Sequence, residues 1–165
     1  MYGDDAGFTA WLASYGYSLP SGSPTEAVLR ARGSNYIDAA YEALWTGQRT
    51  DGVTQTDGWP RTGATLNCVT AIASDAVPQA VINASYRAAY LEATTSGVLS
   101  ASFSSGQRVK RQKVDVVERE FFDDGGAKAG SSGGFVDAEI DGMMRQFICN
   151  RATKFMFQSI GSDNE

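Results

Sequence analysis

The sequence predicts a mainly α fold, a small helical bundle of about four helices with a β-hairpin or bent strand pair and long loops. Two observations predict this class. Apolar residues recur at helical spacing in four separate stretches of the 165-residue chain, and a 3.6-residue period indicates a helix with one buried face. Residues 107–122 instead alternate and are rich in β-branched side chains, which favours strands. A chain of this length is expected to form one domain with appendages.

A short first helix is predicted over about residues 4–15. Its apolar residues stand at positions i, i+3, i+4 and i+7, which lie on one helical face; they are Phe8, Trp11, Leu12 and Tyr15. The stripe ends at Gly16, so we expect the helix to end there.

A second helix is predicted over about residues 24–45. At its start, Ser23 would be the N-cap, Pro24 would take the first helical position, and Glu26 would complete a capping box. Gly33 lies within the apolar stripe of this segment. A glycine there would let another helix approach closely.

The third predicted helix begins at Pro78 and runs to about residue 95, after a long segment without periodicity. That segment, residues 46–77, is dominated by Gly, Thr, Asp and Asn, and connections of this length are usually functional or disordered. Arg87 and Glu92 are the only charged residues of the helix. We therefore expect it to be covered on more than one side, by its own domain or by a neighbouring subunit.

A strand segment and a last helix complete the expected fold. Residues 107–122 predict a hairpin or one long bent strand, with a possible turn at Asp115. A Gly/Ser linker over 125–134 precedes a helical stripe made of Val136, Ile140, Met143, Met144, Phe147 and Ile148. The expected organisation is one domain over 1–148, with the strands inserted at 107–122, and a C-terminal extension over 149–165 that becomes ordered on a partner.

Composition argues against catalysis and against a cofactor. The chain has no histidine, which removes the commonest general base and metal ligand, and it contains no phosphate-binding glycine loop or nucleophile elbow. We expect no enzyme activity, no catalytic or metal-binding residues and no cofactor. Cys68 and Cys149 lack a CxxC spacing and are expected to be free thiols. No signal peptide or membrane-spanning stretch is expected either.

Four basic residues fall within six positions of the predicted strand: Arg108, Lys110, Arg111 and Lys113. Four such charges could neutralise phosphates, although in a strand they point to both faces. The alternative is a solvated edge strand that is protected by charge or paired with the acidic 115–124 segment. The formal net charge of −5 is the wrong sign for a protein whose whole surface attracts nucleic acid.

Five sequence blocks, taken in order, resemble one family of tailed-phage proteins. The family is that of head-to-tail adaptor or connector proteins, which often carry the label "DnaT-like single-stranded DNA-binding protein". The resemblance spans about residues 2–148, and its most specific block is Trp59-Pro60-Arg61-Thr62-Gly63. The other blocks are Leu29-Arg30-Ala31 through Tyr36-Ile37-Asp38, Thr46-Gly47-Gln48-Arg49, Val77-Pro78-Gln79-Ala80-Val81 and Val109-Lys110-Arg111-Gln112-Lys113-Val114.

The resemblance implies a structural virion protein. Its subunit would belong to a dodecameric ring at the virion neck, made in the host cytoplasm, that joins the portal protein to tail, stopper or nozzle proteins. During viral genome ejection, DNA would pass the lumen without specific binding, and no membrane would be involved. The alternative function is single-stranded DNA binding through the basic strand 108–113.

Two sets of residues receive expected roles with this function. The apolar tail residues are expected to contact the portal, because they follow the last helix without a core of their own; they are Phe155, Met156, Phe157 and Ile160. The block over 59–63 is expected to be structural. Within it, Arg61 would bond backbone carbonyls and Trp59 would cover a helix pair.

Overall fold

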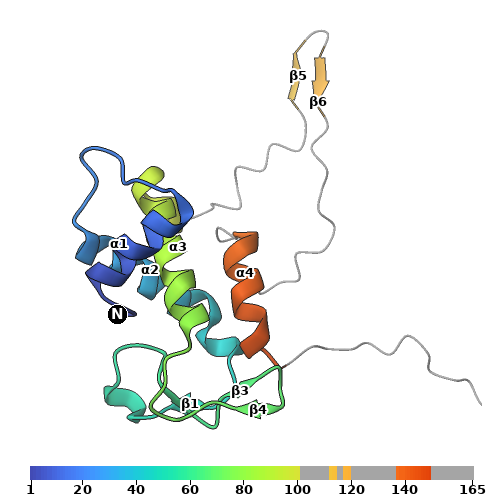
Figure 1. Cartoon of the computed structure of the whole chain (residues 1–165). Helices are drawn as coiled ribbons and strands as arrows, with labels where there is room; N and C mark the ends of the chain where they lie inside the picture. Colours follow the sequence, from blue (N-terminus) through green and yellow to red (C-terminus); the bar gives the residue numbers. More distant parts are fainter. Residues whose placement is uncertain (101–111, 115–116, 120–136, 150–165) are drawn as a thin grey trace, which may run out of the picture.

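The structure is a computed structural model that describes residues 1–100, 112–114, 117–119 and 137–149 (Figure 1). Its helices are α1 (Asp5–Tyr15), α2 (Glu26–Tyr41), α3 (Gln79–Thr94) and α4 (Ala138–Met144). Its antiparallel strand pairs are β1 (Gln48–Arg49) with β2 (Arg61–Thr62), β3 (Thr65–Leu66) with β4 (Thr70–Ala71), and β5 (Gln112–Val114) with β6 (Val117–Arg119). The mainly α fold class is confirmed.

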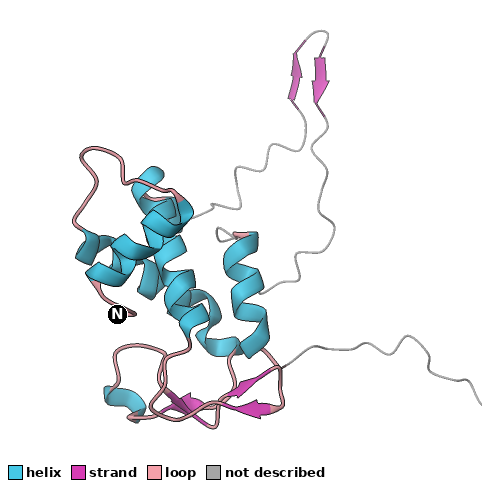
Figure 2. Ribbon diagram, viewed as in Figure 1, coloured by secondary structure: helices cyan, strands magenta, loops and turns pink. Residues whose placement is uncertain are grey.

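Helices α2 and α3 pack against each other at the centre of the molecule, with α1 and α4 beside them (Figure 2). Gly33 makes this contact possible, since a Cβ atom there would lie 2.3 Å from the carbonyl oxygen of Ser85. The main core cluster joins α2, α3, α4 and the loop segment 45–64; its largest buried members are Tyr2, Ile37, Tyr41, Trp45, Trp59, Val81, Ile140, Met144 and Phe147. A second cluster lies between α1 and its neighbours and contains Phe8, Trp11, Leu12, Leu29, Tyr86 and Ala89.

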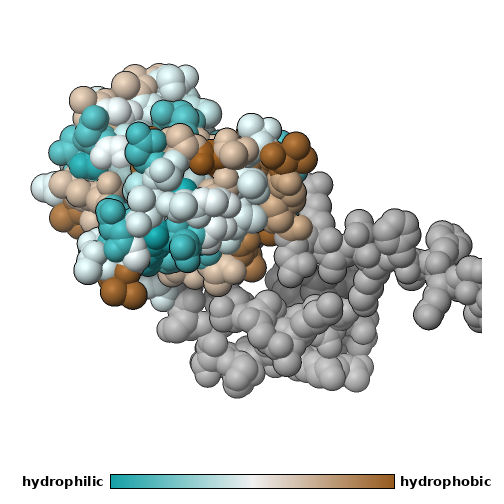
Figure 3. Space-filling model, turned by 90° about the horizontal axis from the view of Figure 1, so that it is seen from below, coloured by the Kyte–Doolittle hydropathy of each residue, from teal (hydrophilic) through white to brown (hydrophobic). Residues whose placement is uncertain are grey.

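The long connection between α2 and α3 is folded. It forms the β1–β2 and β3–β4 pairs and a 3₁₀ turn at Gly52–Thr54, together at one end of the bundle (Figure 2). Seen from that end, apolar residues stand at several separate places among hydrophilic ones (Figure 3). The most exposed of the large apolar side chains are Val53 and Val69.

The start of α2 differs from the predicted capping box. Thr25 is the N-cap and makes no side-chain capping bond. Ser23 instead donates its hydroxyl to the carbonyl of Pro20 at 2.8 Å, and Glu26 accepts from Thr9. Serine hydroxyls bond nearby carbonyls readily, so the preceding turn takes the group that was expected to cap the helix.

Helix α4 is shorter than its apolar stripe suggests and continues as a 3₁₀ turn over Arg145–Phe147. Its N-cap is Asp137, whose carboxylate accepts from the backbone N–H of Glu139 and of Ile140, both at 3.1 Å. Val136, at the start of the predicted stripe, lies outside the described residues. No helix in the described ranges is both long and apolar enough to cross a membrane.

The two cysteines form a disulfide, which corrects the expectation of free thiols. The Cα atoms of Cys68 and Cys149 lie 5.3 Å apart, within the usual range for a disulfide. They meet because the β3–β4 turn reaches the end of α4, where Asn67 donates its N–H to the carbonyl of Gln146 at 2.7 Å. This tertiary contact joins residues 81 positions apart, so sequence spacing gave no sign of it.

Candidate nucleic-acid interface

The charged residues are distributed unevenly along the chain. We define the helical body as residues 1–100 and 137–149; it contains twelve acidic residues, six arginines and no lysine. Residues 101–136 contain six basic and five acidic residues, and four of these basic residues fall within 108–113. The helical body is therefore strongly acidic, whereas the basic strand is a local positive segment.

Each arginine of the helical body has a carboxylate partner within 4 Å. The pairs are Arg30–Asp5 at 2.7 Å, Arg32–Glu92 at 3.0 Å, Arg49–Glu42 at 2.6 Å, Arg61–Glu42 at 3.6 Å, Arg87–Asp137 at 3.3 Å and Arg145–Asp141 at 2.6 Å. A cation that already has an anionic partner offers less to an incoming phosphate. This part of the chain therefore presents no uncompensated cationic patch.

The pair between Arg49 and Glu42 shows how firmly these charges are held. Nε and Nη2 of Arg49 donate to the two oxygens of Glu42 at 2.6 and 2.7 Å. The hydrogen bond from Arg49 lowers the pKa of Glu42 and raises that of Arg49. A bidentate, charge-assisted hydrogen bond of this kind is stronger than a simple ion pair, so both groups stay ionised near neutral pH.

The Trp59–Gly63 block fastens the folded connection to the bundle. Arg61 is buried and donates to three carbonyls: Nε to Thr46 at 2.9 Å, Nη1 to Gly58 at 3.1 Å and Nη2 to Gly47 at 2.6 Å. Trp59 is 2% exposed and packs its ring against those of Trp45 and Phe147. Each of the three nitrogens of Arg61 thus donates to a backbone carbonyl.

A buried polar pair supports the same block. The hydroxyl of Tyr2 donates to Asp38 and accepts the backbone N–H of Trp59. The other oxygen of Asp38 accepts the N–H of Gly58 at 3.0 Å. Burial raises the pKa of Asp38 and that of Tyr2. The N-terminal segment is thus tied to the loop by side-chain hydrogen bonds of Tyr2 and Asp38.

The last two residues of the basic segment 108–113, Gln112 and Lys113, belong to β5 of the β5–β6 hairpin. The pairing is antiparallel, with Gln112 opposite Arg119, Lys113 opposite Glu118 and Val114 opposite Val117. A hairpin was one of the two arrangements predicted for 107–122, and the pairing favours it over a single bent strand. Arg108, Lys110 and Arg111 lie outside the described residues, so their role as contacts stays a prediction.

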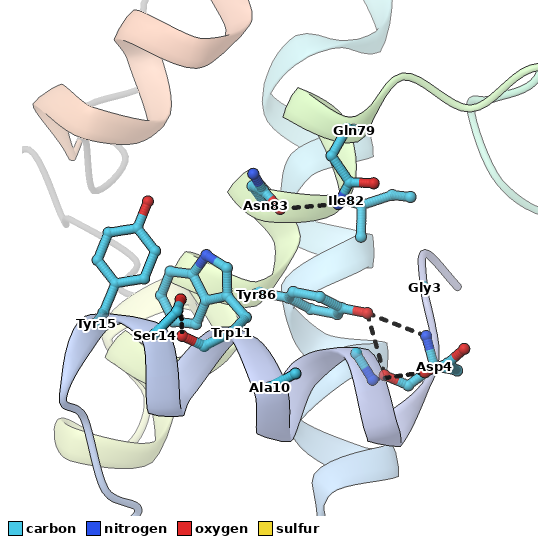
Figure 4. Close-up of a pocket in the computed structure, with 11 residues that line it drawn as sticks. Gly3, Asp4, Ala10, Trp11, Ser14, Tyr15, Gln79, Ile82, Asn83 and Tyr86 are labelled. Carbon is cyan, nitrogen blue, oxygen red and sulfur yellow. Dashed lines mark hydrogen bonds between the residues drawn. The ribbon is translucent and has the colours of Figure 1, made fainter.

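An aromatic groove lies between α1 and α3 (Figure 4). From α1 it is lined by Trp11 and Tyr15, and from α3 by Gln79, Asn83 and Tyr86. Trp11 and Tyr15 were assigned to one buried stripe from their spacing, but Tyr15 is 51% exposed whereas Trp11 is 7% exposed. Periodicity gave no sign of the groove, because it does not tell which part of a stripe the neighbouring helix covers.

The predicted portal-contacting residues Phe155, Met156, Phe157 and Ile160 lie outside the described residues. Within the ranges that the structure describes, no group of three or more acidic or cysteine side chains is placed to hold a metal ion.

Residues 2–158 match the model of a protein family described as "Putative DnaT-like ssDNA binding protein". The chain belongs to this family. Membership in the DnaT-like family corrects the main function expected from the sequence. The family is described by single-stranded DNA binding and not by a virion connector role, so the expectation of an adaptor subunit in a head-to-tail ring is wrong. The alternative, single-stranded DNA binding, agrees with the family better.

No curated protein and no solved structure matches the chain. The ring, the portal and tail partners and the neck localisation that were expected with the adaptor role stay untested.

Proposed function

We propose that this DnaT-like protein binds single-stranded DNA, and that Arg108, Lys110, Arg111 and Lys113 supply the phosphate contacts. Binding without turnover is the proposed activity. The family description supports the ligand class, and the charge distribution of the chain supports the location.

The observation that carries the location is the pairing of the arginines in the helical body. All six have carboxylate partners at 2.6 to 3.6 Å, in a body with twice as many acidic as basic residues. Such a surface repels a phosphate backbone. The segment 108–113, with four cations and no acidic residue, is the place where the sequence concentrates positive charge.

The acidic body has a use in this arrangement. It disfavours contacts between DNA phosphates and the rest of the molecule, because like charges raise the free energy of such contacts. In the backbone register of the hairpin, Lys113 stands opposite Glu118.

Salt dependence tests the proposal. Each phosphate neutralised on a single strand contributes about −0.7 to the slope of log K against log salt. Four contacts therefore predict a slope of about −3 and an affinity loss of about 50-fold between 50 and 200 mM salt. The measurement is fluorescence anisotropy of a labelled oligodeoxythymidine with the full chain.

Matched charge reversals locate the contact. Lys110→Glu should weaken binding and flatten the salt slope, because it removes one cation from the basic strand and adds an anion. Arg145→Glu makes the same charge change on the helical body, at an exposed side chain paired with Asp141 four residues earlier, and should leave the slope unchanged. If the wild-type protein does not bind at low salt, the proposal is refuted. If the two variants lose affinity equally, the basic segment 108–113 is not the DNA-binding site.

A further inference from the structure

The groove between α1 and α3 has the size and lining of a small-molecule site. Its volume is about 580 Å³, and typical ligand pockets hold about 300–1,000 Å³. One wall is aromatic and comes from α1, and the other carries amide side chains from α3 (Figure 4). None of these residues takes part in the basic strand or in the Trp59–Gly63 staple.

Its aromatic wall is held rigidly. The rings of Tyr15 and Trp11 have centroids 4.8 Å apart, and Tyr15 is stacked on Tyr17 at 5.8 Å. Tyr17 is in turn stacked on Tyr90 of α3 at 4.3 Å, with the two planes 7° apart. These neighbours fix the ring of Tyr15 while about half of its surface stays exposed. A ring that is held in place and half-exposed can act as a stacking platform, because little conformational entropy is lost when a flat ligand binds to it.

The opposite wall offers hydrogen bonds. The side-chain nitrogen of Gln79 donates to the oxygen of Asn83 at 3.0 Å. This bond leaves the oxygen of Gln79 as an acceptor and the nitrogen of Asn83 as a donor, one helical turn apart. The indole nitrogen of Trp11 is buried and has no hydrogen-bond partner among the described residues. Nucleobase edges present donors and acceptors side by side, which matches such a pair of amides.

Charge decides which part of a nucleotide fits. The ionisable carboxylate in the lining is that of Asp4, which accepts the N–H of Gly7 at 2.6 Å, and no lysine or arginine lines the groove. A phosphate would find no cation there. A flat, uncharged heterocycle with hydrogen-bonding edges fits both walls.

We propose that this groove binds a nucleobase of single-stranded DNA by stacking on Tyr15, with Gln79 and Asn83 contacting the base edge. The inference rests on the proposed function, since the basic strand supplies the phosphate contacts that the groove lacks. Single-stranded DNA-binding proteins combine these two elements, a cationic track and aromatic platforms. In this chain they come from different stretches of the sequence.

Filling the groove tests the inference without removing any of its contacts. Ala10 is an exposed residue of α1 that lines the groove, and Ala13 is an exposed residue of the same helix that does not. We expect Ala10→Leu to weaken binding of labelled oligodeoxythymidine by the full chain about tenfold, the typical loss for one stacked base. Ala13→Leu should bind like the wild type, and Tyr15→Ser should weaken binding to a similar extent as Ala10→Leu.

The salt slope separates this site from the basic strand. Neither Ala10→Leu nor Tyr15→Ser removes a cation, so both variants should keep the wild-type slope while their affinity falls. If both bind as tightly as the Ala13→Leu control, the inference is overturned and the proposed function stands. If the wild-type protein does not bind the oligonucleotide at low salt, the inference and the proposed function both fail, because no DNA is then available to the groove.

Discussion

Replacing Arg61 by methionine removes hydrogen bonds while keeping most of the side-chain volume. The guanidinium is 5% exposed and donates to the carbonyls of Thr46, Gly47 and Gly58. Gly58 is buried, Thr46 is half-buried and Gly47 is exposed. The three carbonyls therefore differ in whether water can replace the lost donor, and the first two determine the effect.

A hydrogen bond to a charged group contributes about 1.5–3 kcal/mol, and a buried carbonyl left without a donor costs about 1–3 kcal/mol. Because Gly47 is exposed, we expect water to replace the lost donor at its carbonyl. Burying the guanidinium costs desolvation free energy, and this burial also lowers the pKa of Arg61. Methionine carries no such cost, which offsets part of the free energy lost with the hydrogen bonds. We expect Arg61→Met to lower the free energy of unfolding by about 3 kcal/mol.

Urea unfolding followed by tryptophan fluorescence measures this loss, because Trp45 and Trp59 lie in the affected core. With an m-value of about 2 kcal/mol per M of urea, the midpoint of urea unfolding should fall by about 1.5 M while the m-value stays unchanged. Arg61→Lys should be intermediate, since an ammonium keeps the charge without the planar fork. Arg145→Met, at a 71% exposed side chain, is the matched control with an expected change within about 0.5 kcal/mol. A loss for Arg61→Met no larger than that of the control would refute the reasoning.

Two further predictions concern the disulfide and Glu42. Reducing the Cys68–Cys149 bond, which joins residues 81 positions apart, should lower the free energy of unfolding by up to about 4.5 kcal/mol on the chain-entropy model; a urea midpoint that is unchanged by dithiothreitol would contradict it. Because the bond from Arg49 lowers the pKa of Glu42 below its ordinary value, Glu42 adds stability at pH values above that ordinary pKa, and this stability is lost as the pH falls through the folded pKa. Glu42→Gln should therefore show a weaker decline of the urea midpoint in acid than the wild type, and equal declines would exclude this role.

The elements that the sequence predicted best are those with local signals at both ends. Helix α1 follows its apolar stripe and ends at Gly16, whose φ of 68° is left-handed, a conformation that glycine adopts readily. Helix α3 begins directly after Pro78. The close approach at Gly33 also followed from its place in an apolar stripe. Local chemistry decided these features, so a single sequence was enough to find them.

The features that the sequence did not predict depend on tertiary contacts. The disulfide requires the β3–β4 turn to meet the end of α4, and no spacing rule brings Cys68 to Cys149. The groove requires α1 to cross α3 so that Trp11 is covered and Tyr15 is left half-exposed. Both residues have the same periodicity, and only the position of the second helix distinguishes them.

The two charged residues of α3 fasten the two ends of the segment that carries the basic strand. Glu92 accepts the backbone N–H of Gly97 and of Leu99, just before residue 101, and Arg87 bonds Asp137, just after residue 136. Both attachment points therefore belong to one helix of the bundle. It follows that an insertion or deletion between residues 100 and 137 would leave both attachment points, Glu92 and Arg87, on the same helix.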